Sequence, residues 1–517
     1  MAFKSIMFPD NEKAINLKDT APEYFDDLNL DQIIDSILSD KRLEYLRAYY
    51  YTPLASGKII AYRQMILKEL NDPDIFNPLL NFSEEIRSLE SRRTQICKNL
   101  FSEAEYRKTF LEKSRLYSAA FDYCTIVKGI YSYLKAKNPE SEGLRSFTQA
   151  LSAYISSDDF INVERETCRL RSIFSSLRYT LNINQSVITV KKYSGEKEYK
   201  DKIERTFQKF NDDDQAIPEI KKSDYGFAEH VEAGILNLVA TEIYKDEFSQ
   251  LDEFCSAFCN FMDPLILLFA KEIMFYISYS VYMDKFKRQG LAFCIPELKD
   301  DKFSFLLKDG FDLALAEKLI RCGMKIVCND ISINQDERIV IITGPNQGGK
   351  TTFARMIGQI SYLASLGCHI PGLFASLEIP DKIFTHFEKH ESVLSLEGKL
   401  SDDILRINSI LSAATPKSLI IINEFLASTS IEDAVIIGKL ILNKISDKKC
   451  ICLFVTFIYD LYETKENIVS MKASIEKENP EKRTYKIVRE LPDDKAYALC
   501  LANKFGITKD AIIERIK

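Results

Sequence analysis

The sequence predicts a C-terminal α/β domain that follows a long helical region with a small β insertion. From about residue 325, apolar runs that suit buried strands alternate with helical patterns, in the order RIVIITG, FARMIGQISYLA, LIIIN and CICLFVT. This alternation favours a doubly wound parallel sheet. Upstream, SEEIRSLESRRTQICKNL is rich in helix formers, and few Gly or Pro interrupt the region that follows before Pro139. We therefore expect long helices, one of them beginning with Ser83 as its cap.

A period-two pattern interrupts the helical region near residue 177. Leu177, Tyr179, Leu181 and Ile183 alternate with polar residues, and a second apolar run, VITV, follows after Asn184-Gln185-Ser186. Alternation of this kind indicates a half-buried strand, and the short polar segment suits a turn. A pair of strands is therefore predicted here.

The next segment, KKYSGEKEYKDKIERTFQK, is strongly basic. Its lysines include Lys191, Lys192 and Lys197, and Tyr193 and Tyr199 lie among them. Two interpretations remain open, a solvated charged face and a small module that contacts phosphates.

The helical pattern then resumes from about Val231 to Gln289. Its most apolar part, Phe261 to Met283, contains Asp263, Lys271 and Glu272. Charges at these positions predict a packed core helix and no membrane span.

Length and composition set broad bounds. A chain of 517 residues has room for about three domains. The net charge of −7 gives no sign of nucleic-acid binding, so any contact with DNA must come from local basic surface. The twelve cysteines contain no Cys-x-x-Cys pair, and Cys450 and Cys452 lie in an apolar run. Buried reduced thiols without a signal peptide suggest a cytoplasmic protein.

The segment GPNQGGKT fits the phosphate-binding pattern G-x-x-x-x-G-K-[ST]. It lies between an expected strand and a helix with an apolar stripe, so backbone N–H groups and the helix N-terminus would converge on phosphate oxygens. Lys350 is expected to contact the β- and γ-phosphates of ATP, and Thr351 to hold Mg²⁺. The expected nucleotide-binding residues are Gly344, Pro345, Asn346, Gln347, Gly348, Gly349, Lys350, Thr351 and Thr352.

An amide occupies the second site that such ATPases need. Asn423 and Glu424 follow the apolar run Leu419 to Ile422, where a P-loop ATPase carries two acidic residues. Mg²⁺ prefers oxygen ligands, and Asn423 offers it a carbonyl oxygen without charge. Glu424 keeps the position that polarises the attacking water. The predicted metal ligands are therefore Thr351 and Asn423, and the predicted catalytic residues are Glu424 and Asn423.

Several segments resemble the MutS family. TGPNQGGKTT is similar to the family's Walker A segment, usually TGPNMGGKST, and NEFLASTS to its DEIGRGTS. VCNDI resembles VPNDV, with Asn329 as the Asn, and RTYKIVRELPDDKAYALCLANKFGI resembles the family's final segment. FYISYSVYMDKFKRQGLAFCIPEL is similar to the lever helix, and YTPLASGKIIAYRQMILKEL to the start of the helical core. The resemblance covers most of the chain and is strongest over about residues 325 to 510.

The resemblance implies an α/β P-loop NTPase fold of the ABC-like, MutS type. Residues 301–517 would form the ATPase domain, and residues 1–300 a helical core and lever. Residues 175–225 would be a small clamp-like insertion.

In that family two protomers form a clamp on DNA, and each ATP site is completed by the partner's signature loop. The resemblance therefore implies a homodimer through the ATPase domain, with the signature residues Ser428, Thr429 and Ser430 near the interface. It places Asn329 in the nucleotide site and favours duplex DNA as a partner, contacted by Lys191, Lys192 and Lys197.

Departures from the family bear on mismatch recognition. The sequence begins at the family's core, so the mismatch-reading and connector domains are not expected in it. Phe-x-Glu, the motif that mismatch readers insert, occurs at Phe82, Phe101 and Phe227 in helical or core contexts, and none is assigned that role.

Other departures bear on catalysis. Asn423 replaces Asp, Phe457 replaces a His that would donate a hydrogen bond near the γ-phosphate, and Leu426-Ala427-Ser428 replaces Gly-Arg-Gly. At the position expected to stack on adenine, the nearest candidate is Leu298.

Two functions remain in view. The first is a MutS-like, homodimeric ATP-binding clamp on DNA with slow hydrolysis. The alternative is a nucleotide-sensing interaction scaffold without productive hydrolysis. An ABC-type or SMC-type ATPase would need an LSGGQ-like segment, which SLEGKLSDD matches poorly.

Overall fold

The computed structural model describes residues 3–9, 15–100, 109–184, 187–195, 234–299, 305–334, 336–388, 399–425, 429–462, 465–476, 483–492 and 512–513. The chain forms two compact units whose segments interleave in sequence. The helical unit consists of Met1–Ser5, Asn77–Pro139 and Leu144–Lys271, and the sheet unit of Ile6–Phe76, Glu140–Gly143 and Glu272–Lys517. Residues Ile6–Phe76 thus pack with the C-terminal part of the chain. The division into a core and lever up to residue 300 and an ATPase domain after it stays a prediction.

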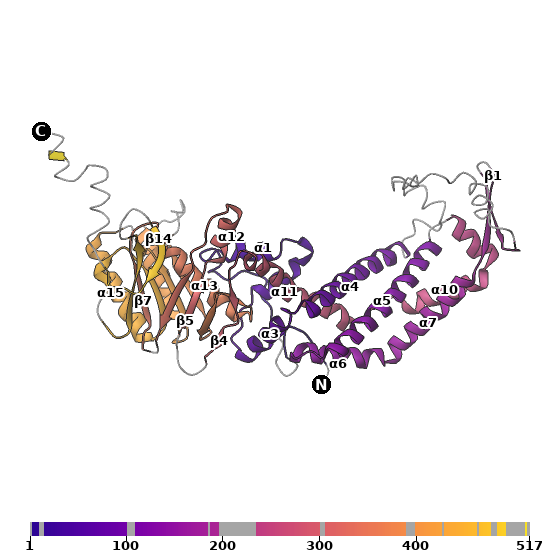
Figure 1. Ribbon diagram of the computed structural model, residues 1–517, viewed down its shortest axis with the longest axis horizontal. Helices are drawn as coiled ribbons and strands as arrows, with labels where there is room; N and C mark the ends of the chain where they lie inside the picture. Colours follow the sequence, from indigo (N-terminus) through magenta and orange to yellow (C-terminus); the bar gives the residue numbers. More distant parts are fainter. Residues whose placement is uncertain are drawn as a thin grey trace, which may run out of the picture. The chain divides into compact units, whose positions relative to one another are not determined.

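Long helices build the helical unit, as the sequence predicts (Figure 1). Its rings pack closely, with the Phe147 and Phe269 centroids 3.4 Å apart and Phe82 beside both. The helices are α5 (Thr109–Lys137), α7 (Asp158–Ser176), α10 (Lys245–Phe258), the π-helix η3 (Val239–Ile243), and the parts of α4 (Pro73–Leu100), α6 (Glu142–Ile155) and α11 (Pro264–Lys287) that belong to this unit.

The expected helix start at Ser83 is wrong. Ser83 lies within α4, which begins ten positions earlier at Pro73, and its buried hydroxyl donates to the Ala270 carbonyl oxygen at 2.6 Å. Ser83 therefore satisfies a buried carbonyl of another segment, which no local pattern indicates.

The predicted pair of strands is confirmed. β1 (Tyr179–Asn184) and β2 (Val187–Lys192) pair antiparallel, with Tyr179 opposite Lys192 and Asn184 opposite Val187. Lys191 and Lys192 end β2, whereas Lys197 and residues 196–225 of the predicted insertion lie outside the described residues.

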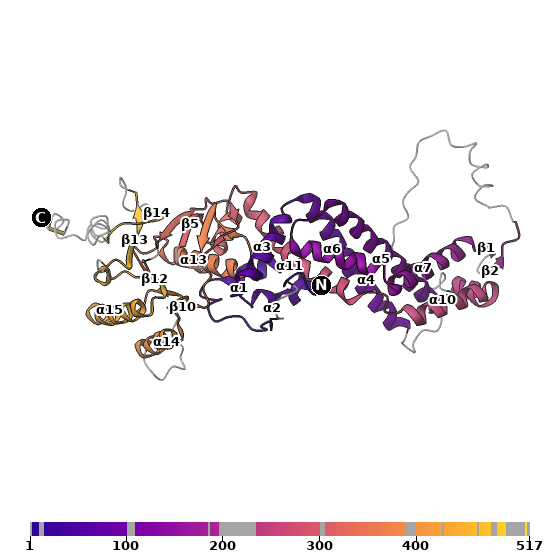
Figure 2. The ribbon, with the colours of Figure 1, turned by 90° about the horizontal axis from the view of Figure 1, so that it is seen from below.

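A six-stranded sheet with helices on both faces dominates the sheet unit (Figure 2). Ile420 and Ile422 pack in one cluster with residues of α14 (Lys399–Ala413) and α15 (Ile431–Lys448), whereas the Ile421 side chain meets Gly358 of α13 (Lys350–Ser365). Since side chains alternate across a strand, α13 covers one face and α14 and α15 cover the other. The strand order is β10 (Ile383–Phe387), β11 (Leu419–Asn423), β12 (Ile451–Val455), β7 (Ile339–Thr343), β13 (Ile468–Ile475) and β14 (Arg483–Val488). All neighbours are parallel except β13 and β14, so the predicted parallel sheet is confirmed.

Smaller sheets and short helices complete the sheet unit. A second sheet has the order β4 (Glu297–Leu298), β9 (Phe374–Leu377), β5 (Phe305–Gly310) and β6 (Asn329–Ile333), and β3 (Phe293–Cys294) pairs with β8 (Ile370–Pro371). Other helices among the described residues of this unit are α1 (Leu30–Ile37), η1 (Lys41–Leu46), α2 (Arg47–Tyr50), α3 (Gly57–Glu69), α12 (Leu313–Arg321) and η4 (Tyr459–Leu461).

A buried arginine ties the end of α13 to the N-terminal segment. Arg63 is 1% exposed and donates to the Met7 and Leu366 carbonyl oxygens, both at 3.1 Å. Burial lowers the pKa of Arg63, and the buried Glu272 carboxylate, which accepts from the Ile6 N–H at 3.1 Å, is one of the groups that oppose this shift. A guanidinium at this place satisfies a carbonyl oxygen at the C-terminal end of α13 and is stabilised by the negative end of the helix dipole.

Two further predictions concern apolar segments. α11 is long and apolar enough to cross a membrane by length and composition, but 67% of its most apolar window is buried within the protein, as in a core helix. Cys450 and Cys452 are free and buried, as predicted.

Candidate functional site

The glycine-rich loop, residues 344–349, joins β7 to α13. β7 lies between β12 and β13. The strands of this sheet that follow β7 in the chain therefore lie on both sides of it, with β10, β11 and β12 on one side and β13 and β14 on the other. Crevices at the carboxyl ends of parallel strands, where the strand order changes direction, are the usual ligand sites of such sheets.

The loop is tightly packed, and its backbone needs glycine. Gly344 has φ +126°, and a Cβ there would stand 2.8 Å from the Ala473 Cβ. A Cβ on Gly348 would lie 2.9 Å from both the Ala473 Cβ and the Pro345 carbonyl oxygen. Gln347 also has a positive φ, of 61°. The loop therefore needs residues that tolerate positive φ and close contact, as anion-binding glycine-rich loops do.

Lys350 begins α13 and is 3% exposed. Its Nζ donates to the carbonyl oxygens of Gly344 at 3.0 Å and Pro345 at 3.1 Å. Burial lowers the pKa of Lys350, whereas the Glu424 carboxylate raises it. The ammonium group is thus folded against the loop at the N-terminus of the helix, where an anion is favoured.

The two predicted metal ligands lie in contact. The Thr351 hydroxyl donates to the Asn423 Oδ1 at 2.9 Å, and Asn423 ends β11. Both oxygens are neutral, so the pair offers hard ligands to Mg²⁺ without the charge of a carboxylate. Glu424 follows at φ +54°, with its N–H bonded to the Val455 carbonyl oxygen at 3.0 Å. Glu424 is half-buried and lies beside Asn423 in the chain.

The other residues that the sequence predicts for the site lie on the segments after β11 and β12. Phe457, two positions after β12, is 38% exposed. Thr429 precedes Ser430, which caps α15 by accepting from the Asp433 N–H at 3.2 Å. Leu426, Ala427 and Ser428 lie outside the described residues.

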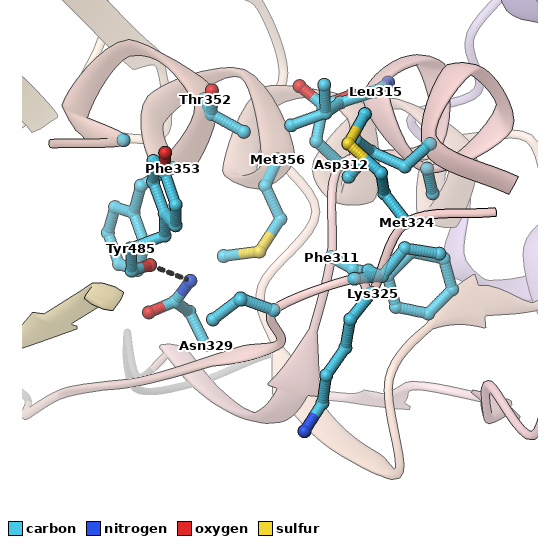
Figure 3. A pocket seen from close by; sticks show the side chains of 15 residues that line it. Phe311, Asp312, Leu315, Met324, Lys325, Asn329, Thr352, Phe353, Met356 and Tyr485 are labelled. Atoms are coloured by element: carbon cyan, nitrogen blue, oxygen red, sulfur yellow. Dashed lines mark hydrogen bonds between the residues drawn. The ribbon is translucent and has the colours of Figure 1, made fainter. Parts of the chain in front are cut away.

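A pocket of about 340 Å³ opens beside the loop, and sequence reasoning missed it. In Figure 3, Thr352, Phe353 and Met356 of α13 lie along one wall, with Tyr485 and Asn329 at one end. The other lining residues come from α12 and nearby segments: Phe311, Asp312, Leu315, Ala316, Leu319, Met324, Lys325, Ile326, Val327 and Gly349. A mostly apolar pocket next to a phosphate loop suits a nucleoside.

Asn329 lines this pocket, and its side-chain amide bonds to the backbone of β14. Its Nδ2 donates to the Tyr485 carbonyl oxygen at 3.1 Å, and its Oδ1 accepts from the Ile487 N–H at 2.8 Å. The amide thereby holds β14 against β6, and the Tyr485 ring stays next to Gly349.

The role of Leu298 beside adenine stays a prediction, and the structure places Leu298 away from the pocket. Leu298 packs against Leu54, Ile59 and Ile60 and does not line the pocket. Tyr485 lines it instead. Tyr485 belongs to RTYKIVREL, so the resemblance of that segment was the signal that could have indicated it.

The fold and this site define a class of protein: an α/β domain with a parallel sheet and a glycine-rich loop between its central strand and a buried helix. Residues 340–517 match the model of MutS domain V. The chain is 29% identical over 230 residues to the DNA mismatch repair protein MutS of Orientia tsutsugamushi (strain Boryong), covering 44% of this chain and 26% of that protein. It is 35% identical over 167 residues to the protein of the same name from Rickettsia rickettsii (strain Sheila Smith), covering 32% and 19%. The chain therefore spans about a quarter or less of the length of these relatives, and its C-terminal part is MutS-like.

Proposed function

We propose that this chain is a MutS-like ATP-binding protein whose sheet unit has a P-loop NTPase fold. One observation carries the proposal: Lys350 and Thr351 open a buried helix after a glycine-rich loop, and Thr351 contacts Asn423 at 2.9 Å. Loop N–H groups and Lys350 bind the phosphates, and the neighbouring pocket takes the nucleoside. Thr351 and Asn423 would hold Mg²⁺, which neutralises phosphate charge when bound.

Calorimetric titration with ATP tests this proposal. Lys350→Ala should abolish measurable binding, because it removes the cation and the donors that face the phosphates. Lys68→Ala, an exposed lysine on α3, is the matched control and should bind ATP like the wild type. Tight ATP binding by Lys350→Ala would contradict the proposal.

Hydrolysis is proposed to be slow and Mg²⁺-dependent. Glu424 would orient and polarise the attacking water, and Thr351 and Asn423 would hold Mg²⁺ without a carboxylate. Glu424→Ala should therefore retain ATP binding and lose turnover in a phosphate-release assay.

We also propose a protein partner and a nucleic-acid partner for this chain. The relatives are named as DNA mismatch repair proteins. The proposal is a cytoplasmic homodimer, formed through residues 301–517 with Thr429 and Ser430 near the interface, that acts on duplex DNA. Lys191 and Lys192 at the end of β2 are the candidate phosphate contacts, and Phe82, which is 2% exposed, is too buried to insert between bases.

A second function is favoured by a specific observation. Asn423 removes a negative charge and Phe457 removes a hydrogen-bond donor that the family pattern has. A scaffold that senses nucleotide without productive hydrolysis fits this composition. Single-turnover hydrolysis of bound ATP separates the two, because a scaffold would release intact ATP.

A further inference from the structure

The pocket beside the glycine-rich loop has a buried carboxylate in its wall. Asp312 lies between β5 and α12 and caps the helix, with its Oδ1 accepting from the Leu315 N–H at 2.9 Å. In Figure 3, Asp312 and Met324 lie at the end of the pocket away from Tyr485 and Asn329. Asp312 is 6% exposed, so a ligand in the pocket would meet a carboxylate that is largely shielded from water.

The fold uses mainly one oxygen of this carboxylate. The hydrogen bonds from the Leu315 N–H and from the Gln359 Nε2, at 2.9 and 3.0 Å, both end at Oδ1. No lysine or arginine forms an ion pair with Asp312 within the described part of the chain. Burial raises the pKa of Asp312, and these two donors oppose the shift. The Oδ2 is therefore the oxygen left for a donor on a ligand, which would lower the cost of burying the charge further.

The distance of Asp312 from the loop suits a nucleobase better than a ribose. Gln359, which bonds to Asp312, lies ten positions along α13 from Gly349 at the end of the loop. Ten residues of α-helix span about 15 Å, and a glutamine side chain points back by about one turn, which leaves roughly two turns between the loop and Asp312. The ribose of a nucleotide is bonded to its phosphate and stays near the loop, whereas the far edge of the base reaches deeper.

A single available carboxylate oxygen selects an amino group on that edge. Adenine carries a 6-amino group, which donates hydrogen bonds, whereas guanine and hypoxanthine carry a carbonyl oxygen at the same position. A carbonyl oxygen cannot donate, and it would leave the buried carboxylate oxygen unpaired. Guanine could offer its N1–H and 2-amino group as a pair of donors, but such a pair needs both carboxylate oxygens, and Oδ1 is already bonded to α12 and α13.

We propose that Asp312 selects the base of the bound nucleotide, and that its Oδ2 accepts a hydrogen bond from the 6-amino group of adenine. This inference rests on the proposed ATP binding and extends it. It assigns the preference for a 6-aminopurine over a 6-oxopurine to one side chain.

Calorimetric titration of the wild type and Asp312→Asn with ATP, GTP and inosine triphosphate (ITP) tests the proposal. Asparagine keeps the capping oxygen at Oδ1 but places an N–H donor where Oδ2 was. The wild type should bind ATP about ten- to a hundredfold more tightly than ITP, and Asp312→Asn should lose this preference. Asp312→Ser also caps the helix but has no second oxygen, so it should lose the preference too. Asp40→Asn, the same change in the cap of η1, is the control and should keep the wild-type ratio of the two affinities.

The outcomes separate this inference from the proposed function. If both Asp312 variants kept the wild-type ratio of ATP to ITP affinity, Asp312 would only cap α12, and its role in base selection would be overturned. ATP binding would still stand in that case, provided that Lys350→Ala had lost it. ITP or GTP binding to the wild type as tightly as ATP would also overturn the inference. Tight ATP binding by Lys350→Ala would refute the proposed function itself.

Discussion

In the proposed Mg²⁺ site, Asn423 offers an amide oxygen where the family pattern has a carboxylate. The Thr351 hydroxyl donates to its Oδ1, so the oxygen is in place and only the charge is missing. Two unit charges about 4 Å apart at an effective dielectric constant near 20 interact by roughly 4 kcal/mol. A water-mediated contact would reduce this to about 1.5–3 kcal/mol, or roughly ten- to a hundredfold.

Asn423→Asp is therefore expected to raise Mg²⁺ affinity about ten- to a hundredfold in ATP turnover measured against Mg²⁺ concentration. Adding Phe457→His should raise turnover further, because imidazole can donate a hydrogen bond near the γ-phosphate. Asn423→Gln, a neutral control, should bring no gain. If the double variant turned over no faster than the wild type, the missing charge and donor would not be what limits the proposed hydrolysis.

His369 gives the fold a dependence on pH. Its side chain is 3% exposed, and its Nε2 lacks a hydrogen-bond partner among the described residues. Burial, together with the nearby Lys287 ammonium, lowers the pKa of His369 from 6.5 to about 4. The folded state therefore holds this imidazole neutral where the unfolded chain would already be protonated.

The sign of the effect follows from this difference. As pH falls from 6.5 towards 4, the unfolded chain takes up a proton that the folded one does not, so the free energy of unfolding falls by up to about 3 kcal/mol. Urea midpoints measured between pH 7.5 and pH 4 should show this loss in the wild type and a smaller loss in His369→Gln, which cannot titrate. Parallel pH dependences in both proteins would argue against a role for His369.

Among the elements, α13 carries Lys350 and Thr351 at its N-terminus, so its position sets theirs. Gly358 lets it lie against the sheet, since a Cβ there would stand 2.6 Å from Leu28 Cδ2 and 2.9 Å from Ile421 Cδ1. The helix that presents Lys350 is thus positioned by contacts made two turns further along.

Gly358→Ala is expected to lower the free energy of unfolding by about 1–3 kcal/mol, because overpacking outweighs the gain in helix propensity. Leu28→Ala alone should cost about 2–5 kcal/mol. The double variant should cost less than the sum of the two, since each change relieves the other. Gly129→Ala on α5 is the control, because a Cβ there meets nothing within 4 Å and should stabilise that helix. If the losses of unfolding free energy in Gly358→Ala and Leu28→Ala simply added up in the double variant, α13 would have room to shift away from Leu28.

At the scale of the whole molecule, the question is whether the hairpin of the helical unit meets DNA. Lys191 and Lys192 end β2, and the Lys192 ammonium lies 5.3 Å from the centre of the Tyr244 ring. Phosphate contacts release counterions, so each phosphate that a lysine neutralises adds about 0.9 to the negative log–log slope of affinity against salt.

Lys191→Glu with Lys192→Glu should weaken binding to duplex DNA and flatten that slope by about one unit for each phosphate that these lysines neutralise in the wild type. Fluorescence anisotropy with a duplex at several salt concentrations measures both quantities. Lys58→Glu with Lys68→Glu, on exposed positions of α3, changes net charge equally and should leave the slope as it is. An unchanged slope in the β2 variant would remove the hairpin from the DNA surface.

Local patterns were enough to predict much of this protein, because they depend on residues adjacent in the chain. The hairpin of β1 and β2 follows from period-two alternation, and the parallel sheet from apolar runs that alternate with helices. The place of Lys350 at the start of the helix that follows the glycine-rich loop follows from glycine spacing. The physical reason is that backbone geometry and side-chain alternation are set within a few residues.

Contacts between distant segments could be assigned only by the tertiary structure. The local sequence predicts Ser83 to be a helix cap, but its hydroxyl bonds to a carbonyl oxygen 187 residues away. Arg63 is buried where its guanidinium donates to the carbonyl oxygens of Met7 and Leu366. Tyr485 reaches the pocket because antiparallel pairing returns β14 along β13 to the loop. Each of these side chains is ordinary in its local sequence. Its position was decided by packing, which requires buried polar groups to find partners wherever the folded chain provides them.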